Sequence, residues 1–68
     1  MTIDEIKIHT APCNIFFHNN TMIYCRWMKV GEHPVMGVTI QIIDADNNKK
    51  NISADTIVRI TKALPLPG

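Results

Sequence analysis

The sequence predicts an all-β domain, a small and strongly bent antiparallel barrel of about five strands. Its apolar segments are rich in β-branched and aromatic residues, which favour strands. Short segments containing Asn, Asp, Gly or Pro separate them and are typical of turns. A chain of 68 residues has room for one core, so we expect a single domain over residues 1–64 and an extended tail over residues 65–68.

The clearest strand is predicted over residues 35–43. Within it, Val38, Ile40 and Ile42 alternate with polar residues, which is the pattern of a strand with one buried face. Residues 44–50 are rich in Asp, Asn and Lys and indicate a turn. This strand and its turn are expected to close the barrel.

The end of the chain has two interpretations. We favour one short helical turn near Ser53 followed by a strand, because residues 56–61 are almost wholly β-branched and such residues disfavour a helix. The alternative is a helix over residues 53–64, with Ser53 as its cap and Leu64 in its last turn. That helix would make the fold α+β.

Near the start of the chain, residues 3–10 are expected to form a half-buried strand, because apolar and polar residues alternate there. Thr2 and Glu5 have the spacing of a helix capping box, which is the alternative. No helical stripe of apolar residues follows them, and Pro12 would stop a helix soon afterwards. The strand is therefore the prediction.

A central hairpin is predicted from residues 13–17 and 21–25, and its register is left open. With a three-residue loop, Cys13 lies opposite Cys25, and both belong to one face of the hairpin. With a two-residue loop at Asn19-Asn20, the register slips by one and the cysteines lie on opposite faces. With the three-residue loop, alternation along the strand extends the face of the two cysteines to Trp27.

Both faces of this hairpin are apolar, although a chain this short has one core to cover them. In one interpretation the barrel bends sharply and the N-terminal strand or the C-terminal tail covers the second face. In the other interpretation this face binds a protein partner or another copy of the chain, since aromatic residues, Met and Arg are enriched in interface cores. The function expected first is a non-enzymatic interaction module. The residues expected to bind the partner are Phe16, Met22, Tyr24, Arg26 and Met28.

Five short strands in a chain of this length most simply form an SH3-like barrel, and an oligonucleotide-binding-like barrel is the second choice. The segment Asn-Ile-Ser-Ala-Asp-Thr-Ile-Val-Arg-Ile, residues 51–60, resembles the last turn and strand of Sm-like or SH3-like barrels. The resemblance covers ten residues, and neither a function nor a site residue is taken from it.

The alternative function is binding of single-stranded nucleic acid. Seven basic and six acidic residues give a net charge of +1, which lacks the strong basic excess of duplex binders. Small barrels nevertheless bind single strands by stacking bases on aromatic residues beside a basic groove. The residues expected to form that groove are Tyr24, Arg26, Lys29, Lys49 and Lys50.

Metal binding and catalysis find little support in the sequence. The histidines and cysteines lack the close-paired spacing of a zinc site, and residues 44–55 lack the Gly and Glu of a calcium loop. No nucleophile lies in a recognisable catalytic motif. We therefore expect no enzyme activity, metal, cofactor or small-molecule substrate. The residues weighed for zinc are His9, Cys13, His18, Cys25 and His33.

Neither a secretory signal nor an apolar stretch long enough to span a membrane is apparent, so we expect the cytoplasm of the host cell and no membrane partner. A reducing compartment favours free, partly buried thiols at Cys13 and Cys25 over a disulfide. Short chains of this type suit accessory roles, as inhibitors, adaptors or assembly proteins, including those encoded by phages and plasmids.

Overall fold

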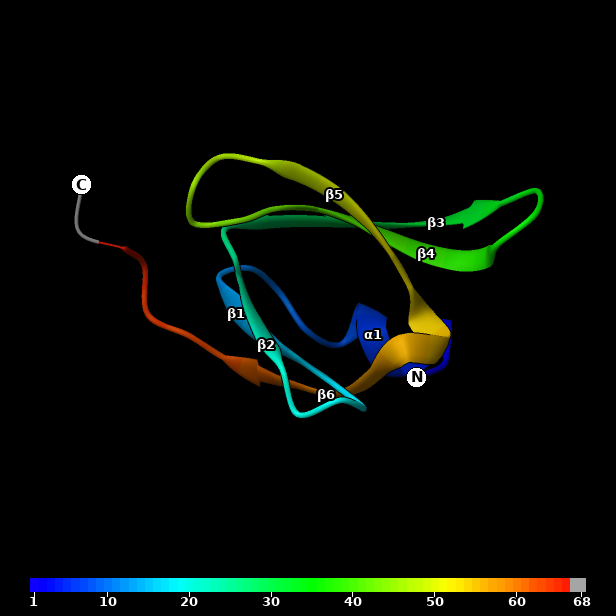
Figure 1. Cartoon of the computed structure of the whole chain (residues 1–68), viewed down its shortest axis with the longest axis horizontal. Coiled ribbons are helices and arrows are strands. Elements are labelled where there is room, and N and C mark those ends of the chain that lie inside the picture. The colour runs from blue at the N-terminus through cyan, green and yellow to red at the C-terminus, as the bar shows by residue number, and fades with distance from the viewer. Residues whose placement is uncertain (67–68) are drawn as a thin grey trace.

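The computed structural model describes residues 1–66 and contains two three-stranded antiparallel sheets (Figure 1). One sheet has the strand order β2-β1-β6 and the other β3-β4-β5. The expectation of a small, mostly β fold is confirmed. The elements are α1 (Ile3–Lys7), β1 (Cys13–Phe17), β2 (Met22–Cys25), β3 (Trp27–His33), β4 (Gly37–Ile43), β5 (Lys49–Ser53), the 3₁₀ turn η1 (Ala54–Thr56) and β6 (Ile57–Lys62).

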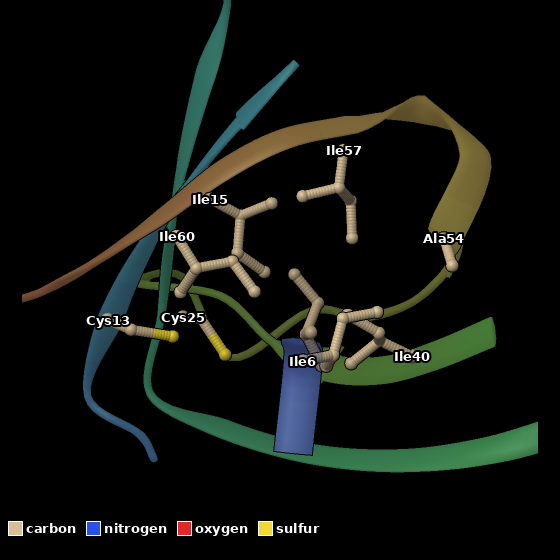
Figure 2. Packing of buried hydrophobic residues seen from close by; sticks show 9 residues of the cluster. Ile6, Cys13, Ile15, Cys25, Ile40, Ala54, Ile57 and Ile60 are labelled. Carbon is tan, nitrogen blue, oxygen red and sulfur yellow. The ribbon is translucent and has the colours of Figure 1, made fainter. Parts of the chain in front are cut away.

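The core gathers apolar side chains from both sheets, α1 and η1 (Figure 2). Isoleucine dominates it, and each fully buried isoleucine contributes about 1.5–3 kcal/mol relative to exposure. Met28, Val30 and Ile52 are partly buried and pack against this cluster. The buried residues are Ile6, Cys13, Ile15, Cys25, Ile40, Ile42, Ala54, Ile57 and Ile60.

The strand predicted over residues 3–10 is wrong, because the chain forms the short helix α1 there. The capping box is made in full: the Thr2 hydroxyl accepts from the Glu5 backbone N–H, and the Glu5 carboxylate accepts from the Thr2 backbone N–H at 3.0 Å. Ile6 is wholly buried and anchors the helix to the core. The single buried residue Ile6 thus holds the helix on the core in place of a stripe of apolar residues. Pro12 lies beyond the end of the helix.

The hairpin adopts the three-residue loop, which settles the register that the sequence left open. Cys13 pairs with Cys25, and the Phe17 backbone N–H donates to the Thr21 carbonyl at 2.9 Å. Asn20 has a φ of 64°, a conformation that Asn tolerates better than most residues. The two cysteines therefore lie side by side on the inner face of the sheet.

Arg26 separates β2 from β3 and changes which residues face the core. Figure 1 shows β2 bending sharply into β3 at this point. The Arg26 backbone N–H donates to the Ile43 carbonyl at 2.7 Å, which ties the bend to the end of β4. Alternation would place Trp27 on the face of Cys25, but Trp27 is 45% exposed and Met28 packs against the core instead.

The C-terminal segment forms the short turn η1 and the strand β6, so the favoured prediction there is confirmed and the helix over residues 53–64 does not occur. The Thr56 hydroxyl donates to the Ser53 carbonyl at 2.7 Å and closes the turn. Pro65 and Leu66 have no regular secondary structure. The remaining tail positions, 67 and 68, lie outside the described residues.

The bend at Arg26 predicts unequal costs for two neighbouring substitutions. Met28→Ala should lower the free energy of unfolding by about 1–3 kcal/mol, because it removes a side chain packed on the core. Trp27→Ala should cost less than Met28→Ala, although it deletes the larger side chain, because Trp27 is half exposed. Urea denaturation of both variants measures the difference. A larger loss of unfolding free energy for Trp27→Ala would contradict the structure, in which Met28 points into the core and Trp27 points outward.

Candidate functional site

The outer face of the sheet β3-β4-β5 brings together one aromatic, one aliphatic, two basic and two amide side chains. The strand register sets them in two rows across the sheet, since paired residues point to the same side. We call the surface formed by these six residues the Trp27 face. Its rows are Trp27–Ile43–Lys49 and Lys29–Gln41–Asn51.

A hollow of about 540 Å³ opens on the Trp27 face. Trp27 forms one side of it and Lys49 another, while Gln41 and Asn51 contribute amide groups. None of its lining residues carries a carboxylate. The lining residues are Trp27, Gln41, Ile42, Ile43, Lys49, Lys50 and Asn51.

The positive charges on the Trp27 face and in its hollow differ in whether a carboxylate balances them. Lys29 and Lys49 are exposed, and neither forms an ion pair within residues 1–66. The Lys50 ammonium lies 3.5 Å from the Asp44 carboxylate, so its charge is partly balanced. Charge available to an incoming anion therefore comes from Lys29 and Lys49.

The turn between β4 and β5 fixes the end of the hollow where Lys49 lies. The Asp44 carboxylate accepts backbone hydrogen bonds from Asp46 and Asn48, both at 2.9 Å. Asn47 adopts a φ of 65° in this turn, and its side-chain oxygen accepts a hydrogen bond from the Arg26 guanidinium. The turn and the bend at Arg26 are thus joined by a side-chain contact.

The backbone N–H of Asn48, together with that of Asp46 and the Lys50 ammonium, lowers the pKa of the Asp44 carboxyl. A carboxyl whose pKa is lower in the folded state stabilises the fold above its ordinary pKa, near 4. That contribution is lost as the pH falls through the lowered value. Calcium binding was weighed for this loop, but here the Asp44 oxygen serves turn hydrogen bonds.

The residues predicted to bind a partner do not form one surface. Phe16, Met22 and Tyr24 lie on the outer face of β2-β1-β6, as expected. Met28 points inward, where the Cys13 thiol contacts its sulfur at 3.7 Å. Arg26 lies at the bend, bound to the β4–β5 turn.

Residues that the sequence reasoning missed complete the outer face of β2-β1-β6. The Arg59 guanidinium lies 4.5 Å from the centre of the Phe16 ring, in a cation–π contact. Val58 is 51% exposed, because the register between β1 and β6 shifts between Phe16 and Phe17. We call Phe16, Met22, Val58 and Arg59 the Phe16 face. No pattern in the sequence of β6 predicted this register shift, which is a β-bulge.

The residues predicted to form a nucleic-acid groove are also divided. Lys29 and Lys49 share the Trp27 face, and Lys50 lines its hollow. Tyr24 belongs to the other sheet, where its hydroxyl donates to the Leu64 carbonyl at 2.8 Å. The aromatic residue that shares a face with Lys29 and Lys49 is therefore Trp27, which the sequence had placed on the face of the two cysteines.

Both cysteines are free and buried. In the part of the chain that the structure describes, no three or more His, Cys, Asp or Glu residues are arranged to hold a metal ion. Over the same residues, none of the helices has the length and apolar character needed to cross a membrane.

Comparison of the chain with family models, with curated proteins and with solved structures finds no match. A functional proposal therefore rests on the two faces described above: the basic Trp27 face with its hollow, and the apolar Phe16 face. Their chemistry differs, and so do the ligands that each would favour.

The Asp44 turn predicts a specific response to acid. Asp44→Asn should lower the free energy of unfolding at neutral pH and flatten its decline below about pH 4, because the carboxylate that titrates is gone. Chemical denaturation at a series of pH values measures this slope. Asp55→Asn, at an exposed position of η1, should follow the wild-type curve. An unchanged acid slope in Asp44→Asn would refute the assignment.

Proposed function

We propose that this chain is a non-enzymatic binding module whose ligand is single-stranded nucleic acid held on the Trp27 face. We further propose that the two sheets are the walls of a small SH3-like barrel. The observation that carries the proposal is a half-exposed tryptophan beside a hollow lined by lysines and amides, with no carboxylate.

Aromatic stacking supplies the first part of the binding energy. Every base has a flat apolar face, and a base stacked on an aromatic side chain contributes about 1–3 kcal/mol. Trp27 offers such a surface, and Ile43 lies directly beside it in the sheet. Since the bases of a duplex are already stacked on one another, this surface favours a single strand.

Electrostatics supplies the second part. Lys29 and Lys49 lie in different rows and on different strands of the Trp27 face, so a backbone crossing the sheet would meet both. Each phosphate contact releases counterions and makes binding weaker in salt. The amides of Gln41 and Asn51 add hydrogen-bond donors and acceptors to the same hollow. We propose the cytoplasm as the compartment, where a reducing environment would keep Cys13 and Cys25 as thiols.

The stacking role of Trp27 can be tested by titration with labelled oligothymidine and oligouridine. Trp27→Ala should weaken binding roughly 5- to 150-fold, the equivalent of one lost stacking contact. Trp27→Phe keeps an aromatic ring and should retain most of the affinity. Fluorescence anisotropy gives the dissociation constants, and a duplex of equal length should bind more weakly. Equal affinity of all three proteins would refute the proposal.

The charge of Lys49 predicts a change in salt dependence. Lys49→Gln should reduce the slope of log affinity against log salt by about 0.7, because one phosphate contact to a single strand is lost. Lys62→Gln removes the same charge from the exposed end of β6, on the other sheet, and is the matched control. If both variants changed the slope equally, the charge effect would not belong to the Trp27 face.

A second candidate function is self-association through the Phe16 face. Met22 is 52% and Val58 51% exposed, and they flank Phe16 and Arg59, residue types enriched in interface cores. This candidate retains the hypothesis of a protein partner, but its binding residues are now those that lie together on one surface. A second copy of the chain is the simplest occupant.

Self-association predicts a molar mass that rises with protein concentration in light scattering. Val58→Glu should abolish the rise, because it replaces an exposed apolar side chain of the Phe16 face by a charged one. Val35→Glu makes the same change at an exposed position in the β3–β4 connection and should leave the association intact. A wild-type protein that stays monomeric at high concentration would rule out this candidate.

A further inference from the structure

We propose that Cys13 and Cys25 form a reversible intramolecular disulfide when the protein meets a low-molecular-weight disulfide such as glutathione disulfide. The cysteine pair lies on the inner side of the β1–β2 hairpin, away from both candidate binding faces. The inference therefore stands independently of the proposed ligand. Figure 2 shows both thiols directed into the same region of the core.

The strand register brings the two residues to the distance that a disulfide requires. Cys13 and Cys25 are direct partners in the antiparallel pair of β1 and β2. Phe17 and Thr21 form a hydrogen-bonded pair, and positions two residues apart repeat this type, so Cys13 and Cys25 form one as well. The Cα atoms of such pairs are about 5.5 Å apart. Disulfides span roughly 4.4–6.8 Å between Cα atoms.

Neighbouring residues set the starting positions of the two sulfur atoms. The Cys13 thiol contacts the Met28 sulfur at 3.7 Å, and the Cys25 thiol donates to the Trp27 carbonyl at 3.0 Å. Both are weak interactions of a neutral sulfhydryl. Rotation of the two side chains toward each other therefore sacrifices little.

The dry surroundings favour a disulfide over a metal at this cluster. Cys13, Cys25 and Met28 together present three sulfur atoms, a set that would suit a soft metal ion. A bound metal would hold both sulfurs as thiolates in the closed core, however, where Cys13 together with burial raises the pKa of the Cys25 thiol and disfavours its charged form. A disulfide is neutral and apolar, so it replaces two buried thiols without burying charge.

Local opening of an edge strand gives the oxidant its access. β2 lies at the edge of its sheet, where β1 is its hydrogen-bonded neighbour. It is four residues long, and Cys25 is its last residue before the bend. Short edge strands open at a lower free energy than the whole fold. Such an opening exposes Cys25 while the rest of the core stays packed.

The chemistry is two successive thiol–disulfide exchanges. The thiolate of one cysteine attacks glutathione disulfide, which forms a protein–glutathione disulfide and releases one glutathione. The second cysteine, as thiolate, attacks the protein sulfur of that bond, forms the Cys13–Cys25 disulfide and releases the second glutathione. The two protein thiols lose two electrons and two protons, and glutathione disulfide gains them as two thiols.

The test equilibrates the folded, full-length protein in glutathione buffers of stepped ratio, followed by acid quenching, alkylation under denaturing conditions and intact-mass analysis. We expect a species two hydrogens lighter than the reduced chain, without alkyl groups and monomeric on a non-reducing gel. Its melting temperature should exceed that of the reduced protein by about 10–20 °C, and dithiothreitol should reverse both changes.

The single variant Cys13→Ala is the matched control, since it leaves Cys25, the thiol that opening of β2 exposes, and should accumulate the glutathione adduct there instead. A wild-type protein that keeps both thiols alkylatable at every ratio would overturn the proposal. A stable mixed disulfide without closure, or cross-linked dimers, would overturn it equally. The wild-type measurement decides even if the variant does not fold.

Discussion

The hydrogen bond from the Arg26 backbone N–H to the Ile43 carbonyl is the constraint on which the rest of the structure depends. It holds the point where one sheet passes into the other, so that a single stretch of chain contributes β2 to one sheet and β3 to the next. Both sheets can then direct apolar side chains into one core, which a chain of 68 residues needs because it cannot stabilise two. The same bend carries Trp27 out of the core and brings Met28 into it.

The candidate binding surface is a by-product of this arrangement. Arg26 also contacts Asn47 through its side chain, so the bend and the β4–β5 turn support each other at one end of the sheet. Trp27 follows the bend directly, and Lys49 follows the turn. The aromatic and cationic parts of the surface are therefore set by rigid connections rather than by mobile loops, as recognition sites usually require.

Local rules foresaw much of the fold, and the errors have identifiable causes. Alternation found the strand that ends at Ile43, turn chemistry found the Asp44 loop, and β-branching distinguished β6 from a helix. The N-terminal helix was missed because its stability comes from a cap and from one tertiary anchor, Ile6. The candidate site was harder to predict, because the alternation of inward and outward side chains was assumed to continue unbroken through Arg26. The bend that shifts this alternation by one residue depends on pairing with a strand distant in sequence. The residue types next to Arg26 do not reveal such pairing.

The bend also makes the chain sensitive to its length in one place. Before Arg26, the odd-numbered residues Cys13, Ile15 and Cys25 are buried, whereas in β4 beyond it the even-numbered Ile40 and Ile42 are. If the bend is retained, deleting a single residue between β2 and β3 would turn every side chain of β3 to the opposite side. Homologous chains should therefore keep the number of residues across this position constant, even where the residue type changes.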